Sequence, residues 1–147
     1  MPTVSRARSL RAAPDEVWRV VSDPWRLPAW WPGVQRVEEA TPESWTKVLG
    51  SASGKTVRAD YTRVEAEPPS RLVWRHETAE SPFERILAES RVEIELESED
   101  GATRVAITLR HRPRGFARFG FFQMRGAAAR QADEALEGLA RLVEEEG

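Results

Sequence analysis

The sequence predicts an α+β domain in which a curved antiparallel sheet of about seven strands wraps around a long C-terminal helix, with two short helices after the first strand. Two patterns predict this fold. Apolar and polar residues alternate through the middle of the chain, which is typical of antiparallel strands with one dry face. Residues 119–145 instead place small and apolar side chains on one helical stripe. A chain of 147 residues has room for one domain, so we expect a single domain over 1–147.

The N-terminal part of the chain is expected to hold one strand and the two short helices. Residues 3–11 alternate apolar residues with arginines and predict a strand. A helix is expected at 14–22, because Pro14 suits the first helical position. Asp23 then precedes another proline, which is typical of the cap and first residue of a second short helix, at 24–30.

Turn-forming proline and glycine residues divide the next part of the chain into further strands. These strands are expected at 34–41, 44–52, 55–67, 70–79, 84–99 and 102–112. The apolar positions change parity within 55–67 after Tyr61, and a bulge near Thr62 explains the change. The sheet therefore has one face for a core and one face for solvent.

The expected C-terminal helix is long enough to cover the dry face of this sheet. A helix over 119–145 is roughly 40 Å long, and a strand of about ten residues measures about 33 Å. The stripe of the helix that faces the sheet holds Ala128 and Ala132, whose small side chains leave space against the strands. That space is a candidate binding cavity.

Composition excludes several function classes. The net charge is −2, whereas a nucleic-acid-binding domain is usually basic, so no nucleic-acid partner is expected. The chain has no cysteine, which removes disulfides, cysteine-ligated metals and thiol catalysis. No metal-ligand spacing and no cofactor fingerprint is readable, so we expect neither a metal nor a cofactor. No apolar run is long enough for an integral membrane segment, and the N-terminal residues lack the apolar core of a secretory signal, so a cytoplasmic location is expected.

Four segments carry a resemblance to a known superfamily. They read PDEVWRVVSD (14–23), LPAWWPGV (27–34), VEAEPPSRLVW (64–74) and GATRV (101–105). Over nearly its whole length the chain resembles the START-like, polyketide cyclase/dehydrase and lipid-transport superfamily, to which birch-pollen-allergen-like proteins belong. The resemblance implies a helix-grip fold with a cavity between sheet and long helix that accepts apolar ligands. It specifies the fold better than the function, because the superfamily includes carriers, enzymes and interaction proteins.

Strand parity nominates the wall of this cavity. Leu72, Trp74 and His76 share one face of their strand, and His111 extends an apolar row on the last strand. The candidate ligand-binding residues are Trp74, Leu72, Tyr61, Ile94, Ile107, Leu109, Phe119, Met124, Ala128 and Ala132.

Three titratable side chains are candidates for proton transfer, namely His76, Tyr61 and His111. Each has a structural alternative. The histidines lie near strand ends, where half-exposed side chains are common, and Tyr61 equally suits a core position with its hydroxyl on a backbone carbonyl. The tryptophans around the short helices either stack on a flat ligand or pack these helices onto the sheet.

The segment 110–125 combines five arginines and four phenylalanines with no acidic residue. Such a segment at a cavity entrance suits anionic amphiphiles or transient contact with an anionic membrane. The alternative is that its phenylalanines pack inward while its arginines pair with glutamates.

The leading functional hypothesis is binding or transport of a small hydrophobic, aromatic or lipid-like ligand in the internal cavity, without catalysis. An enzyme of polyketide cyclase/dehydrase type, acting on an aromatic or polyketide substrate, is the first alternative. An interaction protein of the chaperone-activator or toxin type is the second. Both a monomer and a homodimer are compatible with the sequence.

Overall fold

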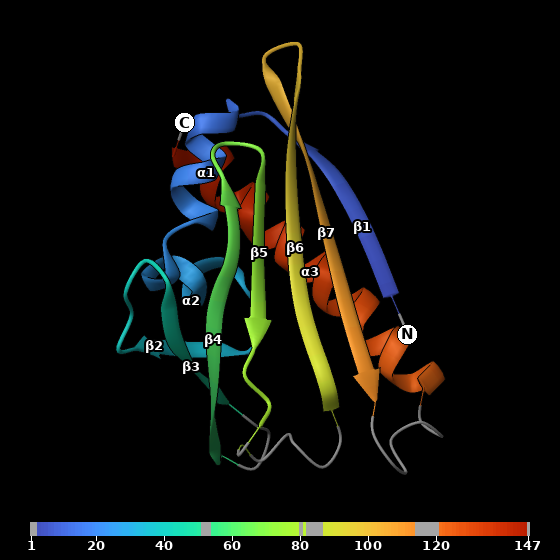
Figure 1. Ribbon diagram of the computed structural model, residues 1–147. Helices are drawn as coiled ribbons and strands as arrows, with labels where there is room; N and C mark the ends of the chain where they lie inside the picture. The colour runs from blue at the N-terminus through green and yellow to red at the C-terminus, as the bar shows by residue number, and fades with distance from the viewer. Residues whose placement is uncertain (1–2, 51–53, 80, 82–86, 114–120, 147) are drawn as a thin grey trace.

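The computed structural model describes residues 3–50, 54–79, 81, 87–113 and 121–146 (Figure 1). Its elements follow the order expected from the sequence. The strands are β1 (Thr3–Leu10), β2 (Val34–Glu38), β3 (Ser44–Gly50), β4 (Thr56–Glu67), β5 (Arg71–His76), β6 (Leu87–Glu99) and β7 (Ala102–Pro113). The helices are α1 (Pro14–Val21), the 3₁₀ helix η1 (Pro24–Arg26), α2 (Leu27–Trp30) and α3 (Phe121–Glu146).

The strands form one antiparallel seven-stranded sheet in the order β1-β7-β6-β5-β4-β3-β2. From β2 to β7 each strand pairs with the next one in sequence, and β1 joins the sheet beside β7. In Figure 1 the sheet curves around α3, while α1 and α2 lie toward the C-terminal end of that helix. The predicted α+β helix-grip fold is confirmed.

Local backbone chemistry sets the exact ends of these elements. The Asp23 carboxylate accepts a hydrogen bond of 3.1 Å from the backbone N–H of Trp25 and caps η1, as expected. β2 stops before residue 41, because Glu39 takes a positive φ of 52° that interrupts the strand. The bulge of β4 that was expected near Thr62 lies at Val64, since pairing with β5 skips this residue.

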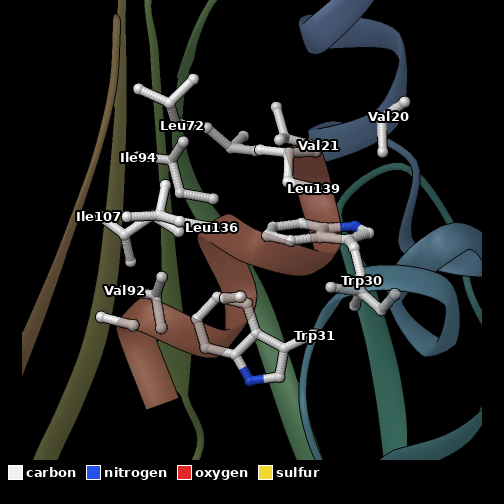
Figure 2. Packing of buried hydrophobic residues seen from close by; sticks show 14 of the residues in the cluster. Val20, Val21, Trp30, Trp31, Leu72, Val92, Ile94, Ile107, Leu136 and Leu139 are labelled. Atoms are coloured by element: carbon white, nitrogen blue, oxygen red, sulfur yellow. The ribbon is translucent and has the colours of Figure 1, made fainter. Parts of the chain in front are cut away.

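The core lies between the concave face of the sheet and α3. Figure 2 shows Leu72, Ile94 and Ile107 on the strands facing Leu136 and Leu139 on the helix. The helix packs chiefly against β1, β7, α1 and α2. The buried apolar side chains in the described part of α3 are those of Ala128, Ala132, Ala135, Leu136, Leu139, Ala140 and Val143.

A glycine lets α2 lie close against α3. A Cβ atom at Gly138 would lie 2.6 Å from the carbonyl oxygen of Trp30 and 3.1 Å from its Cα. Side chains do not approach backbone atoms so closely, so the missing side chain sets the spacing of the two helices. The contact thereby positions Trp30 and the next residue, Trp31, over the sheet.

The outer face of the sheet is polar, as strand alternation predicts. Arg71 lies within ion-pair distance of three carboxylates, those of Glu65 at 3.2 Å, Glu93 at 3.7 Å and Glu95 at 3.1 Å. Each exposed pair adds only about 0–1 kcal/mol. Long side chains of this kind also cover Val73, which is 1% exposed although its register places it among them.

Replacing Thr103 by valine is expected to destabilise the fold by about 1–2 kcal/mol. The buried Thr103 hydroxyl donates a hydrogen bond of 2.7 Å to the carbonyl oxygen of Ala12, between β1 and α1. Valine keeps the shape of the side chain but removes this donor. Urea unfolding measures the loss. Thr108→Val is the control, because the Thr108 hydroxyl meets that of Ser5 in an exposed position. An equal loss in the two variants would contradict a specific role for the buried bond.

Candidate functional site

Five aromatic side chains gather on the inner face of β3, β4 and β5 and at the end of α2. We call this set the aromatic cluster, and its members are Trp31, Trp45, Tyr61, Trp74 and His76. The sheet register places Trp45 directly opposite Tyr61, and Tyr61 directly opposite His76. Residues paired in this way share one face of a sheet. Trp31 directly follows the last residue of α2 and forms its C-cap.

The rings of the cluster meet in two geometries. Trp45 lies parallel to Tyr61 with ring centroids 6.3 Å apart, and Tyr61 lies parallel to His76 at 4.8 Å. The ring of Trp74 meets those of Trp31 and Trp45 edge to face, at 5.5 and 5.4 Å. Contacts of both kinds contribute about 1 kcal/mol each beyond the burial of their surface. The rings of the cluster therefore pack against one another in both stacked and edge-to-face arrangements.

A lysine lies at the centre of the aromatic cluster. Lys47 of β3 is on the same face as the rings and is only 1% exposed. Its Nζ atom lies 4.1 Å from the ring centroid of Tyr61, 4.6 Å from that of Trp31 and 5.1 Å from that of Trp74. The residue opposite on β4 is Ala59, whose small side chain leaves room for the lysine chain.

The amine of Lys47 is buried in an aromatic environment. Among the residues that the structure describes, Nζ has no hydrogen-bond partner. Asp60 of β4 has the opposite parity, and its carboxylate accepts a hydrogen bond of 2.6 Å from the Thr46 hydroxyl on the outer face. Burial of a charged group without a partner costs several kcal/mol of stability. Each cation–π contact offsets about 0.5–2 kcal/mol of this cost.

Burial changes the protonation of the three titratable groups at this site. It lowers the pKa of Lys47 to about 7, because the ammonium loses its hydration. Burial first, and the charge of Lys47 second, lower the pKa of His76 to about 4. Burial also raises the pKa of Tyr61. At neutral pH the site therefore offers a partly neutral amine, a neutral imidazole and an intact phenol.

The structure places the sequence-predicted ligand-binding residues on two sides of the core. The buried members are Leu72, Trp74, Ile94, Ile107 and Leu109 on the sheet, and Ala128 and Ala132 on α3. Of the predicted set, Trp74 and Tyr61 belong to the aromatic cluster. Met124 lies in α3 with its side chain outside the described residues, and Phe119 lies wholly outside them.

Two of the three candidate proton-transfer residues come together. Tyr61 and His76 are stacked cross-strand partners. His111 instead lies on β7, paired with Ser90 of β6, so a whole strand separates it from β5. It is half-buried, and burial lowers its pKa.

Two of the three tryptophans around the short helices, Trp30 and Trp31, pack against the sheet, which was one of the two interpretations. The rings of Trp30 and Trp31 contact that of Trp74, with centroids 6.2 and 5.5 Å apart. Trp25 is 59% exposed. Trp31 also lies beside Lys47. This residue therefore both packs against the sheet and belongs to the candidate site.

The arginine-rich segment 110–125 is described only in part. Arg110 forms an ion pair with Glu93, and Arg112 forms one with Glu89 at 3.9 Å. These two arginines thus pair with glutamates of β6. Residues 114–120 lie outside the described residues, so contact of this segment with anionic ligands or membranes stays a prediction.

Sequence reasoning missed Lys47 and Trp45. Strand parity carries the information, because Trp45, Lys47 and Leu49 alternate along the predicted strand 44–52. Lysine is almost never fully buried without a partner, so a parity argument assigns it to solvent by default. The burial of Lys47 is therefore unusual and marks this residue as a candidate for function.

Residues 1–144 match the family model for polyketide cyclase / dehydrase and lipid transport. The chain belongs to this family. The match spans the four segments from which the resemblance was drawn, and it confirms that resemblance. No curated protein matches the chain.

Solved structures share the fold of this polyketide cyclase/dehydrase and lipid-transport family member at low sequence identity. A START superfamily protein from Mycobacterium smegmatis aligns with a TM-score of 0.79 and 11% identity over 99% of both chains. A protein from Thermus thermophilus, TTHA0849, aligns with a TM-score of 0.78 and 20% identity, also over 99% of both. The di-domain ARO/CYC StfQ of the steffimycin biosynthetic pathway aligns with a TM-score of 0.80 and 13% identity, over 99% of this chain and 51% of that one.

The described residues of this family member contain neither a candidate membrane-spanning helix nor a candidate metal site. None of their helices combines the length and the apolar character needed to cross a membrane. Nor do they hold a group of three or more His, Cys, Asp or Glu side chains arranged for a metal ion.

Proposed function

We propose that this family member binds a small, flat, apolar or aromatic molecule at the aromatic cluster, with an electronegative oxygen of the ligand on Lys47. The observation that carries the proposal is the buried Nζ atom of Lys47, surrounded by rings and without a hydrogen-bond partner among the described residues. The family description, polyketide cyclase/dehydrase and lipid transport, supports a ligand of this class.

The energetic argument starts from the cost of burying an amine. A buried polar group that makes no hydrogen bond costs about 1–3 kcal/mol, and a charged one costs more. The surrounding rings compensate only part of this cost. A ligand oxygen that accepts a hydrogen bond from Nζ recovers the remainder. Lys47 therefore lowers the stability of the empty fold and raises its affinity for an oxygen-bearing ligand.

The rings select the rest of the ligand. Tyr61 stands in a nearly parallel stack with Trp45 and His76, whereas Trp31 and Trp74 meet edge to face. A flat unsaturated molecule can make both kinds of contact, and a saturated chain can make neither. We therefore expect aromatic or conjugated ligands with a carbonyl, phenolate or carboxylate oxygen.

One observation favours a second candidate function, the cyclisation or dehydration of an oxygenated substrate. The lowered pKa of Lys47, about 7, gives an amine that can accept a proton near pH 7, beside the phenol of Tyr61 and the imidazole of His76. A similar structure is described as a di-domain ARO/CYC. Turnover of a bound aromatic precursor would distinguish this function from binding alone. The interaction-protein alternative stays a prediction from the sequence.

We expect the protein to bind 2-naphthoate at least about tenfold more tightly than 2-methylnaphthalene, which has a similar shape but no oxygen. A hydrogen bond to a charged group contributes about 1.5–3 kcal/mol, which covers this difference. Quenching of tryptophan fluorescence measures both affinities, because Trp31, Trp45 and Trp74 line the site.

Two variants test the role of the buried amine. Lys47→Met is expected to bind both compounds equally, since it keeps an apolar chain and removes the donor. Lys55→Met is the matched control, because Lys55 is the other lysine of the chain and is exposed. Equal affinities in the unsubstituted protein, or a preference for naphthoate that survives in Lys47→Met, would reject the proposal.

A further inference from the structure

We infer that Lys47 is placed to form an imine with an aldehyde or ketone carbonyl of the ligand. This inference rests on the proposed binding site and goes beyond it, since it assigns covalent chemistry to the amine. It follows from the position of Nζ inside the aromatic cluster, where no described residue gives it a hydrogen-bond partner.

The first support is the environment of the amine. An imine-forming lysine must be neutral to attack, and a protein achieves this by placing the amine in a dry, apolar pocket. Lys47 is 1% exposed, and aromatic ring faces surround its Nζ atom. Its pKa of about 7 leaves about half of the molecules neutral at pH 7, whereas an ordinary lysine is neutral in less than about one in a thousand.

The second support is the set of groups that face the amine. From β4 and β5 they are Tyr61, which stays protonated, and His76, which stays neutral at pH 7. The neighbour of Lys47 on β2 is Val37, and the rings of Trp31 and Trp74 also lie against Nζ. None of these three side chains titrates. No carboxylate forms an ion pair with Lys47 among the described residues, so none holds it in the charged form.

The step balances without a redox partner. The Nζ lone pair attacks the carbonyl carbon and forms a C–N bond, which gives a carbinolamine. The C–O bond then breaks, and the two amine hydrogens leave with the oxygen as one water molecule. The product is a C=N bond between Nζ and the former carbonyl carbon, and its protonated form is a cation that the ring faces of Tyr61 and Trp31 stabilise. Hydrolysis reverses the step, so the attachment is reversible.

The experiment traps this imine in the unsubstituted protein. The protein is incubated with 2-naphthaldehyde and sodium cyanoborohydride at pH 7, and peptide mapping by mass spectrometry quantifies the reduced naphthylmethyl adduct at each lysine. We expect Lys47 to be labelled at least about tenfold faster than Lys55 of the same molecule, because its neutral fraction is much larger. Labelling of Lys47 no faster than that of Lys55 would overturn the inference.

A second measurement separates this inference from the proposed function. Naphthoate cannot form an imine and reports on binding alone. If naphthoate binds with the preference described above while Lys47 gains no adduct, binding stands and the imine is rejected. If naphthoate shows no preference and Lys47 gains no adduct, both are rejected. Lys47→Arg, which keeps a cation but cannot form the imine, is expected to show labelling at Lys55 only.

Discussion

Replacing Lys47 by methionine is expected to raise the free energy of unfolding by about 3 kcal/mol at pH 6, even though it removes the centre of the proposed site. Methionine is a flexible apolar chain that fills similar space without an unmade hydrogen bond. The lowering of the Lys47 pKa from 10.5 to about 7 corresponds to about 5 kcal/mol against the charged form. Contact of Nζ with the rings of Tyr61 and Trp31 favours the charged form of the lysine and offsets part of this free-energy cost.

This gain is expected to shrink as the pH rises. Between pH 7 and 10.5 the unfolded chain carries a proton on Lys47 that the folded chain has lost, so the stability of the unsubstituted protein rises with pH. Below pH 7 both states are charged and the penalty is complete. Two other titratable groups face Lys47. His76 changes the stability only between about pH 4 and 6.5, and Tyr61 changes it only above pH 10. Val37 and Trp31, which face it from β2 and α2, do not titrate.

Urea unfolding at pH 6, 7, 8 and 9.5 tests this expectation. The unsubstituted protein and Lys55→Met should both gain stability across the series, and Lys47→Met should change least. Parallel curves for all three proteins would mean that Lys47 titrates as an exposed lysine does, which contradicts its burial.

Replacing Gly138 by alanine is expected to destabilise the fold by about 2 kcal/mol. The new Cβ would lie 2.6 Å from the carbonyl oxygen of Trp30, which is a backbone atom and cannot rotate away. Overpacking of this kind costs about 3 kcal/mol, and the better helix propensity of alanine returns about 1 kcal/mol. Because the displaced backbone leads into Trp31, we also expect weaker binding of 2-naphthoate by this variant.

Gly126 of the same helix supplies the matched control. Among the described residues, a Cβ there meets only the end of the flexible Arg130 side chain, at 3.8 Å. Gly126→Ala is therefore expected to stabilise the protein by about 1 kcal/mol through helix propensity alone. Thermal or urea unfolding of both variants checks the opposite signs. Stabilisation by Gly138→Ala would show that α2 moves away from α3 at no cost.

The fold could be predicted because its information is local. Alternation along 84–99 and 102–112 and the helical stripe of 119–145 each depend on residues within one element, and burial enforces both patterns. The exact position of the bulge in β4 could not be predicted from this local information. Parity indicated an extra residue after Tyr61, but pairing with β5 determines which residue it is, and that residue is Val64.

The site could be predicted only in part because its centre depends on tertiary contacts. Tyr61, Trp74 and His76 follow from strand parity, and all three lie in the aromatic cluster. Parity puts Lys47 on the same face as Trp45, but its burial depends on the rings of Tyr61 and Trp31, which come from other elements. The place of Trp31 depends on how α2 docks against α3, which no periodic pattern encodes.

The position of β1 in the sheet determines the order in which the chain can assemble. From β2 to β7 each pairing joins strands that are neighbours in sequence, so it can close as soon as both strands exist. β1 instead pairs with β7, and Ser5 meets Thr108 across 103 residues. Closing such a loop costs about 2 kcal/mol more conformational entropy than closing one of about ten residues. During synthesis β1 therefore leaves the ribosome long before its partner β7, and the two strands can pair only after β7 has emerged.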